Sequence, residues 1–169
     1  MSKVKFATVW LDGCSGCHMS FLDIDERLIE LADKIELVYS PLVDNKEFPE
    51  DVDITLVEGS VSSEDDLHKI RMVRERTKIL AAFGDCAVNG NVPGMRNLFG
   101  VEPTLKRGYY ENVTLNPQTP HRLVPALLQT VKPLHAVVPV DLYLQGCPPT
   151  ADAIYKALAG ILANREAEL

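Results

Sequence analysis

The chain has 169 residues, of which 46% are hydrophobic and 24% charged, a length and composition typical of one globular domain. Its net charge of −7 opposes the phosphate neutralisation that nucleic-acid binding requires, and it also argues against a basic patch for a membrane surface. Because Lys3, Lys5 and Asp12 interrupt the apolar runs near the start, we expect no signal peptide, no membrane insertion and a cytoplasmic location.

Strand-like and helix-like segments alternate in the first part of the chain. The run Val4–Leu11 is rich in β-branched and aromatic residues and ends in Asp-Gly, which predicts a first strand. Apolar residues recur at helical spacing within Ser20–Ala32, which predicts a helix, and Ile35–Tyr39 has the composition of a second strand. The continuously apolar run Ile54–Val57 predicts a third strand, which Glu58 follows directly.

The middle of the chain continues this alternation and then becomes irregular. A helix is expected to begin after Ser62 or Ser63, because a serine cap and the acidic residues that follow suit the first turn of a helix. Ile79–Phe83 predicts a fourth strand. Residues 90–125 are rich in Gly, Pro and Asn, so we expect a short helix around Gly94–Phe99 and otherwise a long connection.

The last part of the chain completes the pattern. Val137–Leu144 is expected to contain a fifth strand, and Pro148 and Pro149 suit the first turn of a final helix. Apolar strands that alternate with helices predict a parallel sheet covered on both faces. We therefore expect an α/β, flavodoxin-like, doubly wound fold, with a mainly parallel five-stranded sheet in a single domain over residues 1–169.

Four cysteines, Cys14, Cys17, Cys86 and Cys147, follow predicted strands. The carboxyl ends of parallel strands share one edge of the sheet, where such folds bind ligands, so these thiols are expected to converge there together with Glu58. Structural disulfides are rare in a reducing cytosol, which leaves metal ligands or buried apolar thiols as the two explanations. Convergence at one edge favours metal ligation, because buried thiols would be scattered along strands and helices.

The pair Cys14 and Cys17, followed by His18, is compatible with several kinds of site. A zinc site usually has a second closely spaced pair, whereas Cys86 and Cys147 are single and remote. A thioredoxin-type dithiol leaves those two cysteines unused, and haem attachment needs an axial ligand and, in most settings, export. Four thiolates satisfy one 4Fe–4S cluster, which spacing alone favours without establishing it. FMN, which flavodoxin-like domains bind at this edge, would compete with a cluster for the same place.

Further candidates lie beside the thiols. Glu58 is one of two things. It is a strand-end carboxylate in water or paired with an arginine, or it lies beside the metal or at a subunit interface, where it assists proton movement or binds iron in an altered redox state. His18 is either a polar residue at the start of a helix or a donor to sulfur. Asp12 either bonds the cysteine loop or supports the Asp-Gly turn. Close backbone approach is expected at three glycines: Gly13, Gly16 and Gly146.

Four motifs together resemble the small subunit of nickel–iron hydrogenases. They are WLDGCSGCHMSFLD (residues 10–23), VEGSV (57–61), GDCAVNGNVPGMRN (84–97) and GCPPTADAI (146–154). They cover nearly the whole chain in the right order, and the resemblance is greatest to the short small subunit of soluble, bidirectional, NAD-linked enzymes. It implies that the four cysteines ligate a 4Fe–4S cluster proximal to a nickel–iron centre, which belongs to a separate large subunit.

Departures from the larger uptake hydrogenases refine this resemblance. Those enzymes have a twin-arginine signal and a second cysteine-rich domain, whereas here we expect neither, and so no second cluster domain. The resemblance then implies that one cluster passes electrons to diaphorase subunits, which carry FMN and iron–sulfur clusters and reduce NAD.

Two alternatives stay open. One is the small subunit of an energy-converting hydrogenase or of a complex-I-like quinone oxidoreductase. The complex I subunit typically has adjacent cysteines where Cys14 and Cys17 are separated by two residues, which disfavours it. The other is a non-enzymatic metal-binding assembly module.

Overall fold

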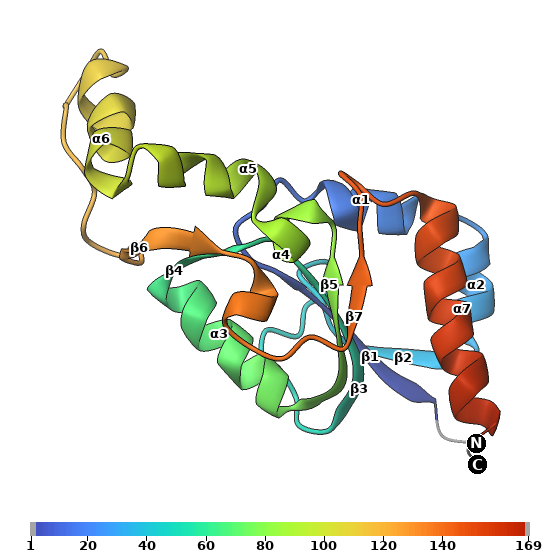
Figure 1. Ribbon diagram of the computed structural model, residues 1–169. Helices are drawn as coiled ribbons and strands as arrows, with labels where there is room; N and C mark the ends of the chain where they lie inside the picture. Colours follow the sequence, from blue (N-terminus) through green and yellow to red (C-terminus); the bar gives the residue numbers. More distant parts are fainter. Residues whose placement is uncertain (1–2, 168–169) are drawn as a thin grey trace.

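A five-stranded parallel sheet forms the centre of the molecule (Figure 1). The computed structural model describes residues 3–167, with side chains as far as Ala163. The strands lie in the order β2 (Ile35–Tyr39), β1 (Val4–Trp10), β3 (Val52–Glu58), β5 (Thr77–Phe83) and β7 (Leu142–Leu144). Counted within the sheet this is the order 2-1-3-4-5, which is that of flavodoxin-like folds, so the predicted fold class is confirmed.

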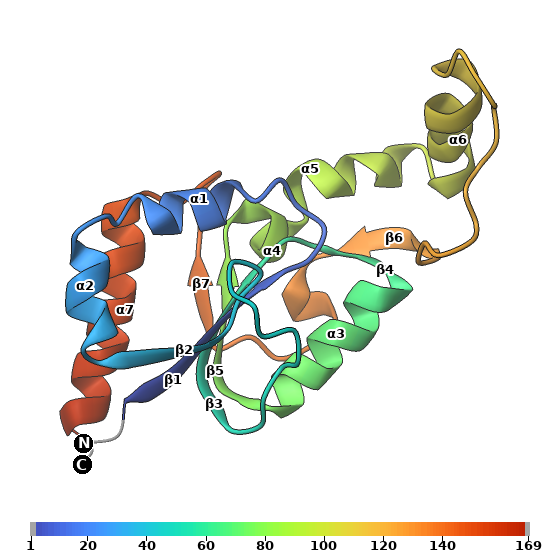
Figure 2. The same cartoon turned by 180° about the vertical axis from the view of Figure 1, so that it is seen from behind.

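Helices cover both faces of the sheet, as Figures 1 and 2 show from opposite sides. One layer packs on one face, where Ile154 and Leu158 are buried against Phe6 and Phe83. It consists of α1 (Gly16–Leu22), α2 (Arg27–Ala32) and α7 (Ala151–Ala167). The other layer consists of α3 (Glu64–Glu75) and α4 (Asp85–Asn89). Burial on both faces explains why the central strand β3 is inaccessible along its whole length.

Helix α3 begins where the sequence indicates. Ser63 is its N-cap, and the Ser63 Oγ accepts a hydrogen bond from the Asp66 backbone N–H at 3.2 Å. The Asp66 carboxylate accepts in return from the Ser63 N–H at 3.0 Å, which completes a capping box. Of the two serines predicted as the cap, Ser63 is therefore the one used.

Three predicted elements differ from the structure. The final helix, α7, begins at Ala151, so Pro148 and Pro149 precede it and do not form its first turn. The helix expected over Ser20–Ala32 is two helices, α1 and α2, because the chain turns between them with Asp25 at φ 60°. The fifth strand, expected within Val137–Leu144, is confined to the three residues of β7. Val138 is buried against the core without joining the sheet, since Pro139 follows it and cannot donate to a strand ladder.

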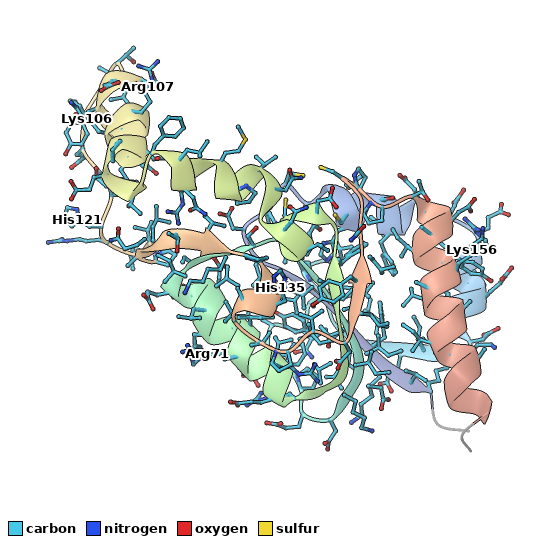
Figure 3. All side chains as sticks on the ribbon, viewed as in Figure 1. Arg71, Lys106, Arg107, His121, His135 and Lys156 are labelled. Atoms are coloured by element: carbon cyan, nitrogen blue, oxygen red, sulfur yellow. The ribbon has the colours of Figure 1, made fainter. Side chains whose placement is uncertain are left out.

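An arm extends from the body after α4, as both ribbon views show (Figures 1 and 2). It consists of α5 (Asn91–Gly94), η1 (Met95–Leu98), α6 (Val101–Lys106) and η2 (Arg107–Glu111). The short helix expected around Gly94–Phe99 is thus present as η1, but the expected long connection also contains α6 and η2. Figure 3 shows Lys106 and Arg107 at the outer end of the arm.

A second, two-stranded antiparallel sheet supports the arm and was not predicted. It pairs β4 (Val61–Ser63) with β6 (Leu127–Lys132), and the 3-10 helix η3 (Leu134–Ala136) follows. Within the part of the chain that the structure describes, no helix has the length and apolar character needed to cross a bilayer.

Candidate metal centre

The four cysteines lie at the carboxyl edge of the parallel sheet. Cys14 precedes α1 and Cys17 lies in its first turn, Cys86 lies in α4 directly after β5, and Cys147 follows β7. All four are free thiols. Cys17 interacts electrostatically with the other three cysteines, and Cys86 also interacts with Cys14 and Cys147. The structure thus brings together four thiols that the sequence separates by up to 133 positions (147 − 14).

Two of these thiols are in surroundings that disfavour a bare thiolate. Burial raises the pKa of Cys17, and the negative charge of Glu58 and the other three cysteines raise it further. Burial also raises the pKa of Cys86, although the backbone N–H of Val92 bonds to its sulfur and offsets part of that effect. A thiolate at either position needs a nearby positive charge, which a bound metal supplies.

Gly84, at the end of β5, lets the chain pass directly over the sulfur of Cys17. A Cβ atom built on Gly84 would lie 2.1 Å from the Cys17 Sγ. The backbone of Gly84, at φ 83° and ψ 163°, is in a region that only glycine adopts readily. Both observations require glycine at the first position of the motif GDCAVNGNVPGMRN.

The three glycines proposed from the sequence also stand at close approaches. A Cβ at Gly13 would lie 3.3 Å from the Gly59 Cα, and one at Gly16 would lie 3.2 Å from the Cys14 Sγ. Gly146 has a φ of 137°, and its Cβ would lie 2.6 Å from the backbone of Pro149. The chain is therefore tightly packed in the loops that carry Cys14 and Cys147.

Glu58 anchors the start of α1. Its carboxylate, in a side chain only 2% exposed, accepts hydrogen bonds from the backbone N–H groups of Cys17 at 3.2 Å and His18 at 3.0 Å. These groups belong to the first turn of the helix, where backbone donors lack intrahelical partners. It also bonds the His18 Nδ1. The interpretation of Glu58 as a carboxylate in water or paired with an arginine is therefore wrong.

His18 is as buried as Glu58 and packs its ring edge-on against Phe83, with ring centroids 6.1 Å apart. With its Nδ1 bonded to the Glu58 carboxylate, the ring proton on that nitrogen is donated to Glu58. The Nε2 atom is buried without a hydrogen-bond partner among the described residues. His18 thus supports Glu58, and Nδ1 is not the atom that donates to a thiol.

Ser60 links the ends of two strands to the cysteine loops. Its fully buried hydroxyl lies 2.7 Å from the Cys86 carbonyl oxygen and 3.3 Å from that of Gly90. Its backbone pairs with that of Asp12 through hydrogen bonds of 3.1 and 2.8 Å. Asp12 therefore holds the Cys14 loop through its main chain.

Asp85 joins the Cys86 loop to the Cys147 loop. Its carboxylate accepts from the Gly146 N–H at 2.8 Å, and its own N–H donates to the Gly146 carbonyl at 2.9 Å. Glu58, Ser60 and Asp85 thus fix the loops of Cys17, Cys86 and Cys147 relative to one another. The motifs VEGSV and GDC contain all three residues.

The donor set fits a cluster better than a single ion. Tetrahedral zinc holds all its ligand atoms about 2.3 Å from one point. Across residues 3–167, no three His, Cys, Asp or Glu side chains are gathered as one metal ion would require. A 4Fe–4S cluster is held by four thiolates distributed over its irons, and four thiols around one edge match that requirement.

Comparison with known proteins gives the family. Residues 14–161 match the model of NADH ubiquinone oxidoreductase, 20 Kd subunit. The NAD-reducing hydrogenase HoxS subunit delta of Cupriavidus necator is 42% identical, over 99% of this chain and 82% of that protein. A subunit of the F420-non-reducing hydrogenase vhu of Methanocaldococcus jannaschii is 40% identical over 98% of this chain, which spans only 58% of that relative.

Solved structures agree with this assignment. A chain of an NAD+-reducing NiFe hydrogenase in the H2-reduced state superposes with a TM-score of 0.92 and 41% identity, over 96% of this chain and 93% of that one. A NiFeSe hydrogenase chain of Desulfomicrobium baculatum shares only the fold, with a TM-score of 0.65 and 18% identity. The resemblance to hydrogenase subunits is confirmed, and the chain belongs to the family of the NADH ubiquinone oxidoreductase 20 Kd subunit.

Proposed function

We propose that this chain is the electron-transfer small subunit of an NAD-reducing nickel–iron hydrogenase. Cys14, Cys17, Cys86 and Cys147 hold one 4Fe–4S cluster, which lies between the nickel–iron centre of a large subunit and the diaphorase subunits. The observation that carries the proposal is the meeting of four free thiols at the carboxyl edge of the sheet. Its support in sequence is the 42% identity to a subunit of an NAD-reducing hydrogenase.

The residues of this chain have defined tasks in that function. A bound 4Fe–4S cluster would supply one-electron transfer at low potential. Glu58 fixes the first turn of α1, so that the Cys17 sulfur keeps its direction. Gly84 leaves room for that sulfur, and Asp85 holds the Cys86 and Cys147 loops together. A rigid set of ligands keeps reorganisation on electron transfer small.

The proposal extends to partners and location. Hydrogen is split on the large subunit, and FMN, NAD and further iron–sulfur clusters are bound by the diaphorase subunits. Residues 1–169 act as one iron–sulfur-binding domain with one cluster. A cytoplasmic location accords with four cysteines that form no disulfide.

Anaerobic purification through a tag on this chain tests the proposal. The complex should contain nickel, flavin, iron and acid-labile sulfide, and it should reduce NAD with hydrogen. Cys147→Ser should lower that activity by at least about tenfold relative to the wild-type complex, because it removes a ligand. A wild-type complex without iron and sulfide, or unchanged activity in the variant, would contradict the proposal.

A second candidate follows from the family description itself, which names a quinone-reducing enzyme. In that case the same cluster would deliver electrons to a quinone, in an energy-converting hydrogenase or a complex-I-like complex. The purified complex would then reduce quinone analogues and copurify with membrane subunits, and it would lack hydrogen-dependent NAD reduction.

A metal-binding assembly module is the remaining candidate, and it predicts a different chemistry. Such a module would be colourless with zinc and insensitive to dithionite. A brown protein that bleaches with dithionite would exclude it.

A further inference from the structure

A tight turn after α4 directs two N–H donors at the sulfurs of two different cysteines. The side-chain amide of Asn91 lies with its Nδ2 3.3 Å from the Cys147 Sγ. The backbone N–H of the next residue, Val92, bonds to the sulfur of Cys86. Sulfurs that follow β5 and β7 are therefore contacted from one turn, which belongs to neither strand end.

The turn is held in place by contacts of its own. The Asn91 N–H donates to the Asn89 Oδ1 at 2.9 Å, and Gly90 immediately before it has a φ of 91°. The buried hydroxyl of Ser60 lies within hydrogen-bond distance of the carbonyls of Cys86 and Gly90, which both precede Asn91. The position of the Asn91 amide is thus determined by the fold around the cysteines.

Asparagine suits this position for two reasons. Asn91 has a φ of 24°, and asparagine tolerates positive φ better than other residues with a Cβ. Its amide also carries two N–H donors and no net charge. An uncharged donor stabilises negative charge on sulfur without adding a counter-ion.

We propose that Asn91 sets the reduction potential of the cluster by donating a hydrogen bond to the Cys147 thiolate. This inference rests on the proposed function, in which Cys147 is a ligand. Reduction adds one negative charge to the cluster and its thiolates. A hydrogen bond to a ligand sulfur therefore stabilises the reduced form more than the oxidised form, and it raises the potential.

Two substitutions at Asn91 and one matched control test this. Asn91→Gly removes the donor and accepts the positive φ, whereas Asn91→Asp keeps the shape but replaces the donor by a carboxylate. Asn89→Asp places the same charge two residues away, at the end of α4, and its carboxylate can still accept from the Asn91 N–H. The midpoint potential is measured by EPR-monitored redox titration of the purified complex.

The wild type should have the highest potential, Asn91→Gly a lower one and Asn91→Asp the lowest of these three. The potential of Asn91→Asp should also lie below that of Asn89→Asp. For Asn91→Gly the ratio of reduced to oxidised cluster at fixed potential should fall on the order of tenfold, about 59 mV for one electron. This follows because only part of a hydrogen bond to a charged group differs between the redox states. Equal potentials in wild type and Asn91→Gly would overturn the inference.

A measurement on the wild type covers the case in which the Asn91 variants lose the cluster. Complex labelled with ¹⁵N in asparagine side-chain amides should show a ¹⁵N hyperfine coupling in the reduced state, and its absence would overturn the inference. A wild-type complex with no iron or sulfide would instead refute the proposed function, so the two failures are distinguishable.

Discussion

Alanine at position 84 would place a methyl carbon where the sulfur of Cys17 lies. The built Cβ is 2.1 Å from the Cys17 Sγ, whereas non-bonded atoms pack best at about 3.5–4.0 Å, so the sulfur must move by roughly 1.4 Å or more. Cys17 is only 7% exposed and packs in the core, so its main chain cannot easily give way. Rotation about the Cα–Cβ bond is the remaining response, and it would turn the sulfur away from its position among the thiols.

Gly100 provides a matched control for this substitution. Its backbone, at φ 86° and ψ 174°, nearly repeats that of Gly84, at φ 83° and ψ 163°. An alanine in this conformation costs about 1–3 kcal/mol at either site. At Gly100 a Cβ would meet no atom within 4 Å, whereas at Gly84 overpacking adds about 1–3 kcal/mol.

The assay is the iron and acid-labile sulfide content of the anaerobically purified complex, together with the free energy of unfolding in urea. Gly100→Ala should lose only the backbone contribution to stability and keep the iron content of the wild type. Gly84→Ala should lose more stability and up to about four irons per complex, which are those of the cluster assigned to this chain. Equal iron in both variants would refute the assigned position of the Cys17 sulfur.

Glu58→Gln should lower the free energy of unfolding in urea by about 2–3 kcal/mol and weaken iron retention, because a carboxamide cannot accept from both backbone amides and the His18 ring; wild-type values in both measurements would count against the anchoring role. In the metal-free protein the pKa of Cys17 is raised above its value of about 8.5 in the unfolded chain. Below that pH the thiol is neutral in both states, whereas above it the unfolded chain ionises first and the folded state loses stability. Stability should therefore fall above about pH 8.5, less steeply in Cys17→Ala, and identical pH curves would contradict this. Ser63→Ala should lower the stability by about 1 kcal/mol through loss of the α3 cap, seen as a lower Tm, and Thr114→Ala at an exposed position serves as the comparison.

Local sequence pattern was sufficient for most of the sheet. The strand Ile35–Tyr39 was predicted with its observed bounds, and the apolar run Ile54–Val57 lies inside β3. Helical periodicity identified the buried side chains of the first helical segment but not its interruption near Asp25. The interruption is hidden because the apolar residues keep a helical spacing on both sides of the turn. The strand β6 was missed because it pairs with the short strand β4, and a sheet of two strands imposes little pattern on either sequence.

The candidate site was predictable as far as topology alone determines it. Strand ends place the cysteines and Glu58 at one edge, since parallel strands point the same way. The contact between Asn91 and Cys147 spans 56 positions and depends on how the arm leaves α4, which no local pattern reveals. Gly84 likewise became identifiable only when the Cys17 sulfur was found beside it.

The most direct test of the account compares the iron and acid-labile sulfide content of the wild-type complex with that of the four single Cys→Ser variants. Because each cysteine is assigned to the same cluster, and the partner subunits keep their own, each variant complex should contain about four irons and four sulfides fewer than the wild-type complex. Zinc in place of iron, or a cysteine whose replacement leaves the iron and sulfide content unchanged, would contradict the assignment of all four thiols to one 4Fe–4S cluster.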